Sequence, residues 1–220
     1  QLANMTTDSV QALTTAQISS LAATNINKLS TATLAAIETA DFAAMTSAQI
    51  NALDTAHIVA MTTAQLRGLD SADFAAISTA GIAALTSDQF NALTTTQVKG
   101  FTTAQLVALT TAEAALLTSG QVAALTSAQV AAIATDDFVK LTTTVINKLT
   151  TGQVSSLSTA QVTSLTTKQL AVLTIAQMAK LTTDQLIAFS TAQAAAFTTA
   201  QVAAIASDDL AVMDTADIAA

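Results

Sequence analysis

The side chains that could do chemistry in this chain are few and stand apart from one another. His57 is the sole histidine and there is no cysteine. A metal centre or a catalytic triad therefore lacks the partners it needs. Serine and threonine are abundant, but no base is placed beside them to activate a hydroxyl group. The sequence predicts that the protein is not an enzyme, holds no metal and uses no cofactor.

Two pairs of adjacent aspartates, Asp136-Asp137 and Asp208-Asp209, offer carboxylates of the kind that calcium binds. Calcium takes about six to eight oxygen ligands, and neither pair lies in an Asp-rich loop with glycine. The five glycines are scattered and make no phosphate-binding loop. We interpret the aspartates as residues of helix first turns. Pooling of carboxylates from neighbouring repeats stays an open alternative.

One set of hydroxyl groups recurs at a fixed spacing. Threonine or serine occupies the third position of an eight-residue repeat in 25 of 27 repeats. A regular hydroxyl ladder suits an ice surface or a glycan, or carries O-glycans. The alternative interpretation is a spare helix cap, because Ala134-Thr135 and Ala206-Ser207 leave no other capping side chain. The candidate binding ladder consists of Thr63, Thr95, Thr103, Thr111, Thr143, Thr151, Thr167 and Thr183.

The repeat that places these residues is strict. From Met5 to Met213 every eighth residue is large and apolar, which gives 27 octads without an insertion or deletion. We label the octad a to h, with a at Leu13. Position f is apolar in all 27 octads, b is Thr, Ser or Asp in 23, and e is Gln, Asp, Glu or Asn in 22. Thr or Ser followed three residues later by Gln or Glu is a capping box, so each octad is expected to begin a helix at b.

The charged residues support these helix boundaries. All 15 acidic residues fall at b, d or e, and six of the seven basic residues fall at g or h, with Lys168 at d as the exception. Acids near a helix N-terminus and cations near its C-terminus complement the helix dipole. The segregation therefore predicts the direction and the limits of each short helix.

One continuous helix does not fit an eight-residue period, because the apolar stripe would drift by about 80° per octad. A β-solenoid is the alternative, but Ala and Gln dominate the remaining positions and are poor strand formers. We predict an all-α solenoid or superhelix with one short capped helix per octad. Positions a and f, which hold all seven Phe, form its core seam. Residues 1–220 are expected to be a single uninterrupted array, and its in-register ends, Gln1 and Ala219-Ala220, predict a segment of a longer array.

Composition excludes two classes of partner. The net charge is −8 with seven basic residues, which does not suit binding to phosphate backbones of nucleic acids. About half of the residues are apolar, yet polar residues interrupt every octad, so no segment of about 18 apolar residues could span a membrane.

The octad, as in Leu125 to Val130 and Phe197 to Ile205, resembles the ALTTAQVA-like tracts of very large bacterial secreted and cell-surface proteins. The resemblance covers the whole chain. It implies a structural repeat protein outside the cell or at its surface, such as an adhesin-like stalk, a rod or a filament subunit. Its implied partners are itself or neighbouring repeat arrays. The alternative function is a surface-binding module that presents the threonine ladder to ice or a glycan.

Overall fold

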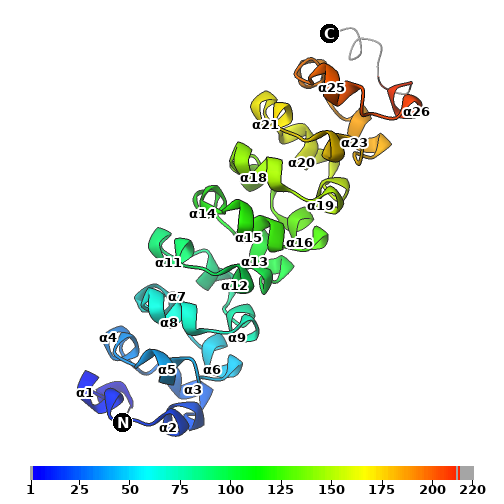
Figure 1. Cartoon of the computed structure of the whole chain (residues 1–220). Coiled ribbons are helices and arrows are strands. Elements are labelled where there is room, and N and C mark those ends of the chain that lie inside the picture. Colours follow the sequence, from blue (N-terminus) through cyan, green and yellow to red (C-terminus); the bar gives the residue numbers. More distant parts are fainter. Residues whose placement is uncertain (1, 212, 214–220) are drawn as a thin grey trace. The chain divides into compact units, whose positions relative to one another are not determined.

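The computed structural model of the chain describes residues 2–211 and 213. Expectations about Gln1 and Ala219-Ala220 lie outside these residues. Each of the first 26 octads forms one short α-helix, and no strand occurs among the described residues (Figure 1). The predicted all-α architecture with one helix per octad is confirmed, and the β-solenoid alternative is wrong.

The chain divides into two compact units, Gln1–Ala108 and Leu109–Ala220, and the division falls between two octads. The first unit contains a 3-10 helix, Leu2–Asn4, and then α1 Thr7–Gln11, α2 Thr15–Ser20, α3 Ala23–Ile26, α4 Thr31–Ala35, α5 Thr39–Phe42, α6 Ser47–Asn51, α7 Thr55–Ala60, α8 Thr63–Gly68, α9 Ser71–Ala75, α10 Thr79–Ile82, α11 Ser87–Asn91, α12 Thr95–Lys99 and α13 Thr103–Val107.

The second unit contains α14 Thr111–Leu116, α15 Ser119–Ala124, α16 Ser127–Ala132, α17 Thr135–Phe138, α18 Thr143–Lys148, α19 Thr151–Ser155, α20 Thr159–Ser164, α21 Thr167–Ala171, α22 Ile175–Met178, α23 Thr183–Ile187, α24 Thr191–Ala194, α25 Thr199–Val202 and α26 Ser207–Leu210.

Each α-helix of the described residues begins at c, directly after an extended residue at b. In α8, for example, Thr62 has φ −70° and ψ 154°, and its hydroxyl accepts a hydrogen bond from the backbone N–H of Gln65. The helix ends before the apolar residue at a, where Leu69 is again extended with ψ 137°. The extended residues at a and b therefore turn the chain between helices. Helices of four to six residues have no stability on their own, so packing must hold them.

Within each unit, a helix packs against the third helix further along the chain. In the first unit α2 contacts α5, which contacts α8, and in the second unit α15 contacts α18, which contacts α21. Side-chain hydrogen bonds between stacked turns join residues 25 to 31 positions apart. One turn therefore takes between three and four octads in both units. This stacking is that of a solenoid, in which each short element is stable through its neighbours.

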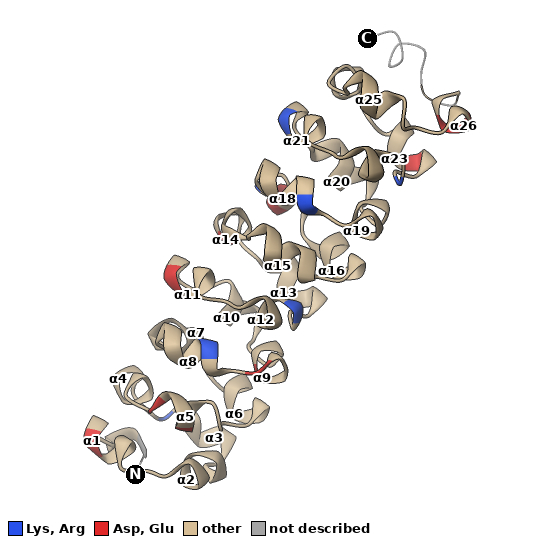
Figure 2. Ribbon diagram, in the orientation of Figure 1, with Lys and Arg blue, Asp and Glu red and all other residues tan. Residues whose placement is uncertain are grey.

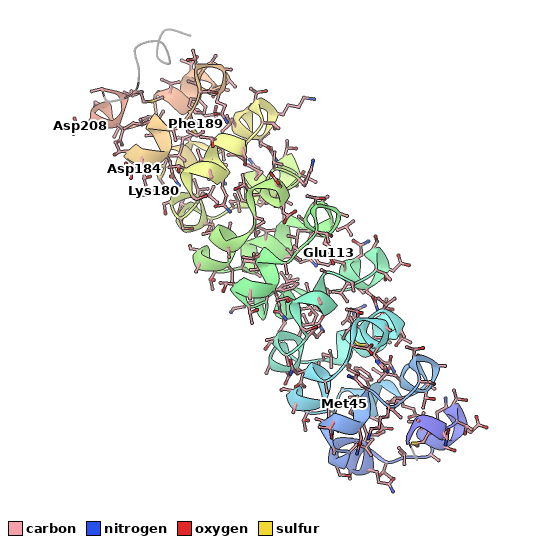
Figure 3. All side chains as sticks on the ribbon, turned by 180° about the vertical axis from the view of Figure 1, so that it is seen from behind. Met45, Glu113, Lys180, Asp184, Phe189 and Asp208 are labelled. Atoms are coloured by element: carbon pink, nitrogen blue, oxygen red, sulfur yellow. The ribbon has the colours of Figure 1, made fainter. Side chains whose placement is uncertain are left out.

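The core of each unit consists of residues at a and f. Side chains at f such as Leu66, Phe74 and Phe90 are fully buried, and those at a are nearly so away from the first two turns and the last. Edge-to-face ring pairs, Phe74 with Phe101 and Phe189 with Phe197, have centroids 5.1 Å apart. Figure 3 labels Met45 and Phe189, two of the buried residues at a. The predicted core seam is confirmed.

Charged residues are sparse along the ribbon of both units (Figure 2). All seven basic residues are exposed. Arg67, Lys99 and Lys148 lie in the last turn of their helices, as predicted. Lys28, Lys140 and Lys180 instead follow the last residue of theirs. Buried acids occur at e, where Asp41, Asp73, Glu113 and Asp137 lie. Among the described residues, no helix has the length and apolar character needed to cross a membrane.

Candidate functional site

The residues at e make the most elaborate set of contacts in the chain. Gln49 is typical: its Oε1 accepts a hydrogen bond from the backbone N–H of Thr46 at 2.7 Å, and Thr46 Oγ1 accepts one from the N–H of Gln49 at 3.3 Å. Such a reciprocal capping box is present in 16 of the described helices, so the expectation drawn from the Thr-x-x-Gln spacing is confirmed.

The same glutamines have a second contact that the sequence does not reveal. Gln49 Nε2 donates to the carbonyls of Ile18 and Leu21, each at 2.8 Å, which lie 31 and 28 residues earlier. These carbonyls belong to the end of a helix one turn below, where the last backbone acceptors lack the full set of helical partners. The Ile18 carbonyl also accepts from the backbone N–H of Leu21 at 3.2 Å, so Gln49 is its second donor. Gln49 is 1% exposed. One buried amide thus caps the start of its own helix and the end of another.

We call the e-position glutamines that donate to these earlier carbonyls the inter-turn ladder. In each of them Nε2 donates to one or more carbonyls 28 to 31 residues earlier within the same unit. The members are Gln49, Gln65, Gln89, Gln97 and Gln105 in the first unit and Gln153, Gln161, Gln169, Gln177, Gln185, Gln193 and Gln201 in the second.

His57 occupies a ladder position and makes the ladder contact. Its Nε2 lies 2.8 Å from the carbonyl oxygen of Leu29, again 28 residues earlier, and its Nδ1 lies 2.7 Å from Asp54 Oδ1. The backbone N–H of His57, and then its ring, lower the pKa of the Asp54 carboxyl by hydrogen bonding to the ionised form. Both ring nitrogens of His57 therefore have hydrogen-bond partners within the fold. Thr33 makes a similar contact, because its hydroxyl donates to the Met5 carbonyl at 3.1 Å.

Aspartates at e use a different bond between turns. Asp73 Oδ1 accepts from the c-position hydroxyl of Ser47 at 2.5 Å, and Asp209 accepts from Thr183 at 2.6 Å, in each case 26 residues apart. Asp41 accepts from Thr15 in the same way. Asp209 of the Asp208-Asp209 pair thus serves stacking. Within the described part of the chain, no group of three or more His, Cys, Asp or Glu is placed to hold a metal ion.

Glu113, labelled in Figure 3, lies at e in α14 and has neither kind of bond between turns among the described residues. Its Oε2 accepts from the backbone N–H and the hydroxyl of Thr110, each at 2.8 Å. Its Oε1 is buried and has no hydrogen-bond partner among the described residues. Burial raises the pKa of the Glu113 carboxyl against the bonds from Thr110, and the negative charge of Asp137 raises it further. Burial, followed by the charge of Asp136, likewise raises the pKa of Asp137.

The eight threonines of the candidate binding ladder are all exposed, and each is the first residue of its helix. Helices α18 and α21 stack, which places Thr143 and Thr167 one turn apart. An open depression of 240 Å³ is lined by Thr143, Thr144, Asn147 and Val172. Among the eight, Thr183 is the one whose hydroxyl has an acceptor within the described residues, Asp209. Among the described residues, no hydrogen bond joins any two of these eight threonines.

The spare-cap interpretation of the c-position hydroxyls is wrong where it was based on alanine at b. Ala134 and Ala206 are the extended N-cap residues of α17 and α26, and neither helix has a side-chain cap hydrogen bond. Thr135 and Ser207 are already the first helical residues. Thr135 and Ser207 therefore do not act as N-caps, and both helices begin without a side-chain cap.

Comparison with known proteins supports the repeat and leaves function open. No curated protein matches the chain. The sequence profile of the ALTTAQ repeat matches four times, at residues 34–71, 66–103, 130–167 and 146–183, which together cover more than half of the chain. Every matched segment begins at position f and ends at position c, so the four matches share one phase of the octad. The chain belongs to the ALTTAQ repeat family.

Proposed function

We propose that this chain is a structural repeat protein that works as an extracellular or cell-surface stalk, rod or filament subunit. The supporting observation is the inter-turn ladder. Within each unit the same glutamine contact joins one turn to the one before it, as with Gln65 to Ile37 and Gln97 to Leu69. A contact that each turn reproduces for the next allows octads to be added without a new kind of interface.

The surface fits this role better than it fits catalysis. The described residues contain no metal-binding cluster, and the buried ionisable groups at e make structural hydrogen bonds. Seven exposed basic residues in 220 leave few cleavage sites for trypsin-like proteases, which suits a protein outside the cell. The resemblance to tracts of large bacterial secreted proteins supports the same location. Its partners are further copies of itself or neighbouring arrays.

Deletion of whole octads tests this proposal. Removing residues 158–181 takes out three octads and joins Leu157 to Thr182 in register. We expect the shortened chain to keep its helical content per residue in circular dichroism, unfold cooperatively and show a smaller maximum dimension in X-ray scattering. The control removes residues 158–177, which breaks the octad register and should lower helicity and stability. Loss of folding in the in-register deletion to the same degree as in the control would contradict a modular spacer.

A second candidate function is a binding module, and one observation favours it. The eight threonines are exposed at equivalent helix positions, and seven of their hydroxyls have no acceptor within the described residues. The test changes Thr143, Thr151 and Thr167 to Ala and compares binding on a glycan array and ice-crystal shape with the native chain. Loss of a native signal supports this function. Absence of any signal from the native chain, or an unchanged signal in the variant, refutes it.

A further inference from the structure

His57 has a hydrogen-bond acceptor at each of its two ring nitrogens. Nε2 lies 2.8 Å from the Leu29 carbonyl oxygen, and Nδ1 lies 2.7 Å from Asp54 Oδ1. A carbonyl oxygen and an ionised carboxylate accept hydrogen bonds and donate none, whereas a neutral imidazole has one donor nitrogen and one acceptor nitrogen. A neutral ring can therefore bond one of these two partners. A ring with a proton on each nitrogen, the imidazolium, can bond both.

A neutral ring that accepts a hydrogen bond at Nδ1 finds no donor for it among the described residues. In a ladder octad, the N-cap backbone N–H donates to the e-position side chain, as from Thr62 to Gln65 Oε1 at 2.9 Å. The backbone N–H of Asp54 donates instead to Asn27 Oδ1 at 3.2 Å. The Asp54 carboxyl supplies no proton either. Hydrogen bonds from the backbone N–H of His57, and then from its ring, lower the pKa of that carboxyl, so it is ionised near neutral pH.

The elements around His57 add no other ionisable group to this arrangement. Helix α7 packs against α4 and α10, and neither of those helices contains an ionisable side chain. Lys28 adjoins Leu29, but its side chain is exposed and its Nζ donates to Asn25 Oδ1 at 2.7 Å. His57 is 5% exposed, and the Asp54 carboxylate is the charge that contacts its ring. A carboxylate bonded to a buried imidazole favours the protonated ring.

We propose that His57 is an imidazolium in the folded array and forms, with Leu29 and Asp54, a proton-dependent clip between two turns of the first unit. Loss of a proton removes one donor, so that either the Leu29 carbonyl loses its partner or a bare nitrogen faces a carboxylate. A proton that the folded chain binds better than the unfolded chain stabilises the fold fully where unfolded histidine is protonated, below about pH 6.5. That stabilisation is lost as the pH rises and the folded ring loses its proton. Acidification therefore tightens this turn, wherever the array is located.

His57→Gln is the informative variant, because glutamine supplies a ladder donor at every pH. Denaturant unfolding of the native chain and the variant is compared from about pH 5 to pH 8, where histidine titrates and Asp54 stays ionised. The other ionisable groups are the same in both chains, so the ratio of the two unfolding constants reports the proton on His57. We expect the native chain to lose stability relative to the variant as pH rises. The ratio should change by at least about threefold in total and at most about tenfold per pH unit, the limit for one proton.

The sign of this change separates the clip from an ordinary buried histidine. A histidine that is buried in its neutral form destabilises the fold in acid, so the native chain would gain stability relative to the variant as pH rises. That result, or a ratio that does not change with pH, would overturn the proposal.

Asp54→Asn is the matched control. Asparagine is as good an N-cap as aspartate, and its amide can donate to an unprotonated Nδ1. The neutral ring then bonds both partners, so the pH dependence that His57 adds should shrink. It is measured as the ratio between the Asp54→Asn chain and the double variant Asp54→Asn, His57→Gln. An equal pH dependence with and without the carboxylate would refute the clip.

The protonation state can also be observed directly, because the chain has one histidine. Labelling with ¹⁵N assigns the ring nitrogen signals to His57 without ambiguity. At about pH 6.5 a histidine in an unfolded chain is half protonated. The clip predicts that at this pH both ring nitrogens of the folded native chain carry protons that exchange slowly with water. A ring with one bare nitrogen at that pH would contradict the proposal, and this measurement decides the question even if a variant fails to fold.

Discussion

At the scale of single residues, the ladder glutamine explains why e is so often Gln. In a capping box the backbone N–H of the N-cap residue donates to a side-chain acceptor three residues on, and Glu or Gln can supply that acceptor. The amide adds a donor on the same side chain, and Gln97 shows its use: Nε2 lies 2.6 Å from the Leu66 carbonyl and 3.0 Å from that of Leu69. The residue thus satisfies buried backbone groups of two helices at once, which a carboxylate cannot do while ionised.

A pair of alanine variants separates the two contacts. Gln17 makes the capping box, but its Nε2 has no hydrogen bond within the described residues, and its side chain is exposed. Gln49 makes the box and both carbonyl bonds. Gln17→Ala should lower the free energy of unfolding by about 0.5–1 kcal/mol and Gln49→Ala by about 2–4 kcal/mol, since the second change also removes both bonds between turns and leaves the Leu21 carbonyl without its donor. Equal losses in urea titrations would show that the bonds between turns add nothing.

His57 gives a second residue-scale prediction. Because its Nε2 reaches the Leu29 carbonyl as a ladder amide does, His57→Gln preserves the contact between turns. We expect a change in unfolding free energy of less than about 1 kcal/mol for His57→Gln. His57→Ala should cost about 2–4 kcal/mol, because the carbonyl then lacks its partner. Thermal unfolding of both variants checks this, and a large loss in His57→Gln would contradict the structural role.

At the scale of elements, the helix limits could be predicted from the sequence because their signals are local. The cap at b and its partner at e are three residues apart, and the acids and bases mark opposite ends of each helix. The stacking could not be predicted from an eight-residue period. Hydrogen bonds between turns join residues 25 to 31 positions apart, and a strict repeat of eight residues gives no signal at that distance. His57 and the buried glutamines were accordingly missed as contacts between turns.

The four helices without a side-chain cap provide an element-scale test. Ala22 is the exposed N-cap of α3, with φ −62° and ψ 131°, and no side chain caps that helix. Ala22→Ser should stabilise the chain by about 0.5–1 kcal/mol, because its hydroxyl can accept from the N–H of Asn25. Thr14→Ala, which removes the cap of α2, should cost a similar amount. Guanidinium unfolding measures both changes, and no gain from Ala22→Ser would show that capping contributes little here.

At the scale of the whole molecule, the chain is a member of the ALTTAQ repeat family in which successive octads reuse the same contacts. Each octad supplies a cap, two core residues and a contact to an earlier turn, and the neighbouring octads supply the rest. Function was harder to predict from the sequence than the fold. In an array of equivalent positions, no single group of residues stands out as a binding or catalytic site. The proposed spacer role is supported by the uniformity of the contacts, and the proposed binding role is supported by the exposed threonines.

The central claim is that short helices stack so that position c of one helix meets position e of the third helix on. The chain has no cysteine, so paired cysteines report this stacking directly. Ser47 Oγ and Asp73 Oδ1 are 2.5 Å apart, and the double variant Ser47→Cys, Asp73→Cys should form an intramolecular disulfide on mild oxidation. The control Thr55→Cys, Asp73→Cys moves one cysteine by a single octad and should stay reduced. Mass spectrometry that found the crosslink in both variants equally, or in the control alone, would contradict the account.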